Sequence, residues 1–392
     1  MQRLIFAIVF LFLAGLVFAQ QAQVNLDWAP HKNTENLPLR YGTGTITPVV
    51  NDDKTVTFKL VAPKAASVSV IGFPFSSSDP IPMAKNNDGI WEVTAGPYDP
   101  DIYYYRLNID GAIVADHDNS FILFGLQPAK SMVTVHGDGP SYYDAKPVPH
   151  GTVTRHIYSS EVTNGERELF VYTPPGYDPN VAYPMLILMG GSGELASGWL
   201  DDGRANFIMD NLLAEGKAKP TIIVFPNNQL LHRNTPDHVK YTFDLTSKEI
   251  FQHILPLVEF KYNTIKSPRG RALAGLSMGG RQSRHIGFRN LDTFGSFGLF
   301  SAGRVESDES FEEFLADPAT NDKIDLLFTG LGTLEPAERY GERLHNTLEE
   351  HNIDHEYYVG GAGHEWITWR HQLHARFLPQ LWQHLEDTAS SE

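Results

Sequence analysis

The sequence predicts a mostly parallel α/β domain preceded by an all-β sandwich. Between residues 27 and 137, short alternating strands follow one another with turn signals between them, which is typical of a sandwich. Between residues 151 and 386, continuous apolar strands alternate with amphipathic helices, which indicates a parallel sheet covered on both faces. Residues 138–150 are rich in Gly, Pro and Asp and are expected to be the linker.

The composition is that of a globular protein and argues against some partners. With 392 residues, of which 42% are hydrophobic, the chain is long enough to bury more than one core. Its formal net charge of −16 argues against binding nucleic acid or an anionic membrane through a basic face. The sequence has no cysteine, which excludes a disulfide framework and a thiol nucleophile.

Residues 1–19 are expected to be a signal peptide. Arg3 precedes an apolar run from Leu4 to Phe18, and Ala19 supplies a small residue for cleavage. The run is shorter than the ~20 apolar residues that a membrane span needs. We therefore expect an exported bacterial protein, periplasmic or secreted, with no membrane segment after cleavage.

The strands of the sandwich are predicted from period-two alternation. Val56, Phe58 and Leu60 alternate with polar residues, and residues 67–72 repeat the pattern. Asp-Gly pairs at 88–89 and 110–111 are predicted to be turns between strands.

The α/β domain is predicted from long apolar and amphipathic segments in alternation. Strands are expected within residues 166–175, 185–189, 221–226, 271–276, 293–302, 323–332 and 355–359. Helices are expected within residues 203–220, 245–262, 278–288, 338–352 and 370–385.

Ser277 lies in the sequence Gly-Leu-Ser-Met-Gly, which has the form Gly-x-Ser-x-Gly. The motif alone is weak in a glycine-rich chain, but a predicted strand precedes it and a predicted helix follows it. This is the setting of a nucleophile elbow, in which the glycines relieve crowding around a strained turn. We expect Ser277 to be a nucleophile; the alternative is a structural turn serine.

A serine hydroxyl needs a base, and the base needs a carboxylate that orients it. When a nucleophile elbow follows a strand, the chain order is serine, acid, histidine. His364 follows the last predicted strand, and Glu335 follows the strand before it, so we expect these two residues to complete a triad. Glu338, one helical turn later, is the rival acid.

The oxyanion of an acyl-transfer intermediate needs backbone N–H donors. One is expected from Met278, directly after the nucleophile, and a second from the glycine-rich loop after residue 189. In that loop Gly191 is the first candidate and Ser192 the next; a plain flexible loop is the alternative.

Several dispersed motifs in residues 150–386 resemble the esterase D-like α/β-hydrolases, specifically the feruloyl and acetyl-xylan esterases of carbohydrate esterase family 1. They are RELFVYTPPGY, GRANFIMDNLLAEGKAKPTIIVFPNN, RALAGLSMGGRQS, LDTFGSFGLFSAG, GTLEP and GAGHEWITWR. The resemblance implies an α/β-hydrolase fold with Ser277 as nucleophile, Glu335 as acid and His364 as base. The chain departs from the family at Met189-Gly190, where His-Gly is usual, and at Glu335, where aspartate is more frequent.

Residues 27–137 resemble the early-set immunoglobulin-like modules of glycogen- and starch-branching enzymes, a carbohydrate-binding type. The motifs are VTFKLVAPKAASVSVIG, GIWEVTAGPYDPDIYYYRLNIDG and SMVTVHG. Trp91 and the tyrosines at 103, 104 and 105 are candidates for stacking on sugars, with core packing as the alternative. Without sugar binding, the module is expected to be a rigid cap that shapes the cleft.

The leading functional hypothesis is a secreted serine esterase that cleaves ferulate-type esters from plant-wall xylan. Its partners would be feruloylated or acetylated xylan and its oligosaccharides, and it would need no metal and no organic cofactor. Candidate substrate contacts are Trp199, Trp366, Trp369 and Gln282. The alternatives are a siderophore (enterochelin-type) esterase, an acetyl-xylan esterase and a non-catalytic carbohydrate-binding protein. The oligomeric state is not predicted.

Overall fold

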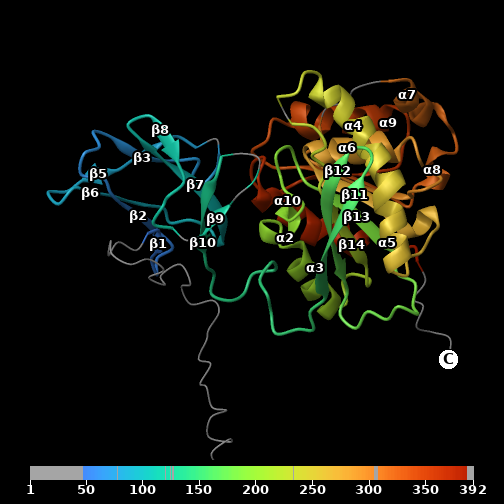
Figure 1. The fold of residues 1–392 in the computed structure, drawn as a ribbon, viewed down its shortest axis with the longest axis horizontal. Helices are drawn as coiled ribbons and strands as arrows, with labels where there is room; N and C mark the ends of the chain where they lie inside the picture. Colours follow the sequence, from blue (N-terminus) through green and yellow to red (C-terminus); the bar gives the residue numbers. More distant parts are fainter. Residues whose placement is uncertain are drawn as a thin grey trace, which may run out of the picture.

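The structure, a computed structural model, describes residues 47–385 except 77, 120, 124, 126, 127, 233 and 304–307. The predicted signal peptide and residues 27–46 of the predicted sandwich lie outside the described residues. Figure 1 shows an all-β unit beside a larger α/β unit. We call residues 47–137 the β-domain and residues 151–385 the α/β domain; residues 138–150, between them, form no helix or strand.

The β-domain consists of two antiparallel sheets around one hydrophobic core. The first sheet has the strand order β1 (Val49–Val50), β2 (Val56–Val61), β6 (Ile90–Ala95), β5 (Ala84–Lys85). The second has the order β4 (Ile81–Pro82), β3 (Val68–Ile71), β7 (Asp101–Ile109), β10 (Lys130–Val135), β9 (Ile122–Leu123), with β8 (Ala112–Val114) paired to β7. Val56, Phe58 and Leu60 of β2 point into the core, as their alternation predicts.

The aromatic residues of the β-domain are mostly core residues. Trp91 is 7% exposed and its indole N–H donates to the carbonyl of Ala62, while Tyr103 is 4% exposed. Tyr105 is 1% exposed and donates its hydroxyl to Asp116. The idea that Trp91 and Tyr103 stack on sugars is therefore wrong, because their rings are already covered by the sandwich.

The α/β domain is built on one eight-stranded sheet. Its order is β11 (Thr152–Ser160), β12 (Gly165–Thr173), β14 (Ile222–Pro226), β13 (Met185–Met189), β15 (Arg271–Leu276), β16 (Ser296–Phe300), β17 (Leu326–Leu331), β18 (Glu356–Val359). The strands from β14 to β18 run parallel, while β11 and β12 form an antiparallel hairpin at one edge. The mostly parallel sheet is as predicted; strand β11 is an additional element.

Helices cover both faces of this sheet (Figure 1). On one face lie α2 (Gly198–Asp201), α3 (Ala205–Ala214), α10 (Trp366–Gln372), the π-helix η5 (Leu373–Phe377) and α11 (Leu378–Gln380). On the other lie η2 (Ile250–Ile254), α5 (Leu255–Lys261), α6 (Met278–Gly287), α7 (Glu309–Ala316) and α9 (Arg343–Glu350). Helix α4 (His238–Glu249) leads into η2 and packs on α6. Successive side chains of β13 point to opposite faces of the sheet. Leu186 packs in the hydrophobic core on the first face, and Ile187 packs in the core on the other face.

Shorter helical segments complete the domain: η3 (Pro268–Gly270), α8 (Thr320–Lys323) and η4 (Glu338–Glu342). No helix in the described part of the chain combines the length and the apolar character needed to cross a bilayer.

A buried ion pair joins the two domains. Arg370 of α10 is fully buried and pairs with Asp101 at the start of β7. The same guanidinium donates to the carbonyl of Asp202 at 2.7 Å, and the Tyr104 hydroxyl donates to the Asp202 carboxylate at 2.7 Å. Because buried charges need partners, this network fixes the β-domain against the helix that begins two residues after His364.

Candidate active site

Ser277 lies on a sharp turn between the central strand β15 and helix α6. Its backbone has φ 51° and ψ −112°, a conformation that L residues rarely adopt. A side chain at Gly275 would come within 2.6 Å of the Gly279 backbone, and one at Gly279 within 2.5 Å of the Gly190 carbonyl. The two glycines of the motif are therefore required by close backbone packing around the strained serine.

His364 lies in the loop between β18 and α10. Its Nε2 atom is 3.0 Å from the Ser277 hydroxyl oxygen. Its Nδ1 atom is hydrogen-bonded to Oε1 of Glu335. Because an ionised carboxylate only accepts, Nδ1 carries the proton and Nε2 can accept the proton of Ser277. This arrangement suits histidine to act as a general base toward the serine.

Glu335 follows β17 and is 7% exposed. Its Oε2 atom accepts hydrogen bonds from the Gly332 N–H at 2.5 Å and from the Ser301 hydroxyl at 2.8 Å. The structure thus places Glu335, and not Glu338, beside His364. Glu338 is exposed, and its carboxylate accepts a hydrogen bond from Arg343 at 2.6 Å. That salt bridge lowers the pKa of the Glu338 carboxyl.

Ser301 is a member of this network that sequence reasoning missed. It is 1% exposed and lies just after β16, between the strands that lead to Ser277 and Glu335. Its hydroxyl donates to Glu335 and accepts from the indole N–H of Trp369 at 3.0 Å. The Trp369 ring also meets the His364 ring edge to face, with centroids 5.1 Å apart. Ser301 and Trp369 therefore hold the carboxylate and the imidazole in place.

Two backbone segments lie close to the Ser277 side chain, the start of α6 and the loop that contains Gly191. The N–H of Met278 is the first of α6, and N–H groups at a helix start have no acceptor within the helix. A Cβ atom at Gly191 would lie 3.5 Å from the Ser277 Cβ, so the Gly191 backbone approaches the nucleophile closely. Gly191 and Ser192 both line the same pocket as Ser277.

The loop at 190–193 is held from behind by residues that follow β14. Asn228 donates to the Gly190 carbonyl at 2.7 Å, and Gln229 donates to the Gly191 carbonyl at 2.8 Å. Gln229 also accepts from the Gly193 N–H at 3.0 Å. These bonds support the loop and occupy the carbonyls of Gly190 and Gly191 with side-chain donors.

Two of the predicted substrate contacts are wrong. Gln282 is fully buried and exchanges hydrogen bonds with Asn228 and Thr246, so it supports the 190–193 loop instead of touching a ligand. Trp199 is 1% exposed, and its indole N–H donates to the Met189 carbonyl at 2.9 Å. Neither side chain is among the residues that line the pocket.

The other two predicted contacts, Trp366 and Trp369, do line the pocket. Their rings meet at 84° with centroids 5.4 Å apart, and Trp199 packs edge-on against Trp366 from behind. Together with Leu276 they give the pocket an apolar surface on the α/β side.

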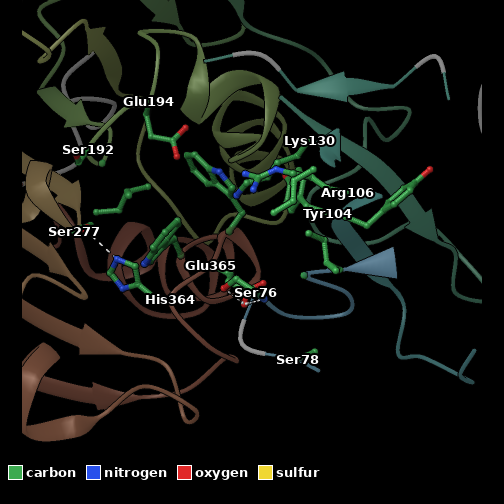
Figure 2. A pocket seen from close by; sticks show the side chains of 18 of the residues that line it. Ser76, Ser78, Tyr104, Arg106, Lys130, Ser192, Glu194, Ser277, His364 and Glu365 are labelled. Atoms are coloured by element: carbon green, nitrogen blue, oxygen red, sulfur yellow. Dashed lines mark hydrogen bonds between the residues drawn. The ribbon is translucent and has the colours of Figure 1, made fainter. Parts of the chain in front are cut away.

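The pocket has a volume of about 720 Å³ and is lined by both domains. Figure 2 shows Ser277, His364 and Ser192 on one side and residues of the β-domain on the other. Among its described residues, the β-domain contributes these to the lining: Ile71, Gly72, Ser76, Ser78, Pro80, Tyr104, Tyr105, Arg106, Asn108, Ile113 and Lys130. Sequence reasoning allowed for a cap over the cleft but did not identify its polar residues.

Two carboxylates of the pocket have raised pKa values. Burial raises the pKa of Glu194 to about 7, reinforced by the negative charge of Asp202 and opposed by Lys130. Burial also raises the pKa of Glu365, which accepts hydrogen bonds from the Ser76 N–H and hydroxyl at 2.8 and 3.0 Å. The second contact ties a loop of the β-domain to the residue that follows His364.

A separate cluster on the α/β domain has the composition of a metal site. Ligand atoms of His345, Glu349 and His355 lie within 4.8 Å of one another, and the two histidine rings are hydrogen-bonded at 2.8 Å. These residues could hold a divalent cation. They are not among the residues that line the pocket of Ser277.

Comparisons with known sequences agree with this geometry. The model of the Esterase family, described as "Putative esterase", matches residues 160–379. The "Endo-1,4-beta-xylanase/feruloyl esterase" of Xylanibacter ruminicola is 30% identical over 334 residues, which are 83% of this chain and 44% of that protein. "Endo-1,4-beta-xylanase Y" of Acetivibrio thermocellus is 31% identical over 153 residues, 36% of this chain and 13% of that protein. The chain thus spans less than half the length of these relatives.

Solved structures give the same fold. A ferulic acid esterase of Anaeromyces mucronatus, in complex with ferulic acid, is 27% identical with a TM-score of 0.54, covering 63% of this chain and 97% of its own. An enterobactin esterase of Shigella flexneri is 19% identical with a TM-score of 0.65, covering 84% and 94%. The second match extends beyond the α/β domain and, at this identity, shows the fold alone. The domain is therefore an α/β hydrolase, and the protein belongs to the Esterase family.

Proposed function

We propose that the protein is a serine esterase that hydrolyses hydroxycinnamoyl (ferulate-type) esters on plant-wall xylan. The observation that carries the proposal is the hydrogen-bonded chain from Ser277 through His364 to Glu335, whose first two members line a pocket together with Trp366 and Trp369. The chain of bonds supports nucleophilic ester hydrolysis. The tryptophans suit an aromatic acyl group, because aromatic rings favour edge-to-face and offset contacts.

In the first half of the reaction, Ser277 Oγ attacks the ester carbonyl carbon while its proton passes to His364 Nε2. Glu335 holds the imidazole in the required tautomer and stabilises its positive charge. The N–H groups of Met278 and Gly191 are suited to bind the oxyanion of the tetrahedral intermediate. The bond to the sugar oxygen then breaks, His364 returns the proton to that oxygen, and an acyl-enzyme remains.

In the second half, water gives a proton to His364 Nε2 and attacks the acyl carbon. The bond to Ser277 Oγ breaks and the serine recovers its proton from the imidazole. The net reaction consumes one ester and one water and yields one carboxylic acid and one alcohol. Every proton passes through His364, which lines the pocket together with Ser277.

The substrate class is supported by the relatives. One curated relative bears the name of a feruloyl esterase joined to a xylanase, and a solved relative at 27% identity is a ferulic acid esterase in complex with ferulic acid. Acetyl esters of xylan remain the alternative within the same reaction. We further propose that the β-domain is an immunoglobulin-like module of the carbohydrate-binding type, and that the protein is exported by its signal peptide to the periplasm or beyond.

A siderophore esterase is the second candidate. It is favoured by one observation, the cationic residues Arg106 and Lys130 in the pocket, because siderophores of the enterobactin type carry acidic catechols. The enterobactin esterases also match this chain over more than the α/β domain. A non-catalytic carbohydrate-binding protein is less well supported, since all three groups of the triad are in hydrogen-bonding contact.

The test compares the wild type with Ser277→Ala. Release of ferulate from feruloylated arabinoxylan fragments and of acetate from acetylated xylan is measured, and circular dichroism checks that both proteins are folded. We expect ferulate release that falls by at least about 10⁴-fold in the variant, as for other triad nucleophiles. Absence of both products from a folded wild type would contradict the proposal, and hydrolysis of a catechol-bearing triester instead would favour the second candidate.

A further inference from the structure

Two basic side chains enter the pocket from the β-domain. Arg106 lies on β7 and Lys130 begins β10, and both line the pocket. Figure 2 shows them across the pocket from Ser277 and His364. A paired positive charge is unexpected in a protein whose net charge is −16. The pair therefore needs an explanation beyond general surface charge.

Arg106 is held in position by the chain segment that leads into β10. Its Nε donates to the Ala129 carbonyl at 3.2 Å, and its Nη2 donates to the Pro128 carbonyl at 3.4 Å. A guanidinium has five N–H donors in a rigid fork, and these bonds use two of them. The side chain is thus oriented by the protein while donors remain for a ligand.

Lys130 lies near two carboxylates of the pocket, and its ammonium also lies over the Tyr104 ring. Its positive charge opposes the raised pKa of both Glu194 and Glu365, which indicates that it lies close to them. Glu365 already accepts two hydrogen bonds from Ser76. Glu194, with a pKa of about 7, is partly protonated at neutral pH. The positive charge of the β-domain wall is therefore only partly balanced within the pocket.

We propose that Arg106 and Lys130 form a cationic subsite that binds an anionic group of the ester substrate. The inference deepens the proposed function and rests on it, because it concerns the same pocket. An arginine fork matches the two oxygens of a carboxylate, and a lysine adds a point charge. Two sources share this chemistry: the uronic acid side groups of acidic xylan, and the catechol oxygens of a siderophore. The α/β domain would supply the chemistry, and the β-domain would select substrates by charge.

The test measures binding in the full-length Ser277→Ala protein, so it does not depend on turnover. Isothermal titration calorimetry compares a xylo-oligosaccharide that carries glucuronic acid with a neutral one of equal length. A second arm compares 2,3-dihydroxybenzoyl-serine with benzoyl-serine. We expect one acidic probe to bind roughly 10-fold more tightly than its less acidic counterpart, the scale of one charged hydrogen bond.

The variants Lys130→Met and Arg106→Gln, introduced singly and together, should each reduce this preference. The double variant should bind both members of the pair within about 3-fold, by the same scale. Lys64→Met is the matched control, since it removes an exposed lysine of the same domain that does not line the pocket. It should leave the preference unchanged.

Each outcome decides the proposal. Preference for the uronate probe identifies acidic xylan, and preference for the catechol identifies a siderophore. Equal binding within both pairs, or a preference that survives in the double variant, would overturn the subsite. Failure of the proposed ferulate esterase is separate: charge-selective binding without ferulate release would leave the subsite standing and reject that activity.

Discussion

The α/β domain presents its reactive groups to the pocket on short turns after parallel strands, whereas the β-domain presents its polar groups along an antiparallel sheet and its loops. Ser277, Glu335 and His364 follow three strands of one sheet, and the carboxyl ends of parallel strands meet at the same edge. Each group is fixed by further bonds from buried neighbours. Among the described residues, Arg106 donates to two backbone carbonyls and Lys130 lies over the Tyr104 ring.

From this difference we infer that the α/β domain carries out the chemical step and that the β-domain selects the substrate. A reactive constellation must keep its geometry within fractions of an ångström, which requires buried and mutually bonded side chains. A wall that recognises substrate can change its side chains without disturbing that geometry. Substitutions on the α/β side should therefore affect the rate of the chemical step, and those on the β-domain side should affect the choice of substrate.

The largest expected effect is that of Glu335→Gln. The amide keeps the shape of the side chain but cannot stabilise the imidazolium or hold the required tautomer, so kcat should fall by about 10³- to 10⁴-fold. Steady-state kinetics on a feruloyl ester would measure it. Glu338→Gln is the matched control, because Glu338 is exposed and bound to Arg343. An equal loss in both variants would refute the assignment of Glu335.

The next effect concerns the junction between the domains. Asp101→Asn leaves the fully buried Arg370 without its counter-charge, which should lower the free energy of unfolding by about 3–5 kcal/mol. Glu92→Gln breaks the half-exposed pair with Lys59 in the same domain and should cost less than about 1 kcal/mol. Denaturant unfolding compares them. Equal, small losses would mean that the buried pair does not hold the domains together.

The smallest effect tests a positioning residue. Ser301→Ala removes the hydroxyl that donates to Glu335 and accepts from Trp369, so kcat should fall roughly 10-fold, about the value of one charged hydrogen bond. Because Ser301 does not line the pocket, KM should stay within about 2-fold on the same scale. Kinetics with and without the substitution separate the two parameters. A raised KM with unchanged kcat would show that Ser301 acts on binding.

The three triad residues of the α/β domain could be predicted from the sequence for a physical reason. The strained turn at Ser277 requires glycines at fixed spacing, and parallel strands bring the loops before Glu335 and His364 to the same edge. These constraints are local or follow from the order of strands. Strands β2 and β3 of the β-domain also lie where alternation predicts them.

Other features depend on contacts that the sequence does not reveal. Gln282 lies one helical turn beyond Met278, and only the structure shows that it faces Asn228 instead of the ligand. Trp199 and Trp91 are buried by elements distant in the chain. Strand β11 has mostly exposed and half-buried residues, so it lacks the apolar run that marked its neighbours. The wall formed by Arg106 and Lys130 requires two docked domains, which no local pattern specifies.

The backbone of Ser277 has a consequence for engineering this protein. A residue with a side chain held at φ 51° and ψ −112° costs about 1–3 kcal/mol, and glycine would adopt this conformation more easily. Selection for heat resistance alone would therefore favour glycine at the one position where the hydroxyl is needed. A screen of variants for thermal tolerance should be scored by ester turnover at every round, since the most tolerant variants at this turn would be inactive.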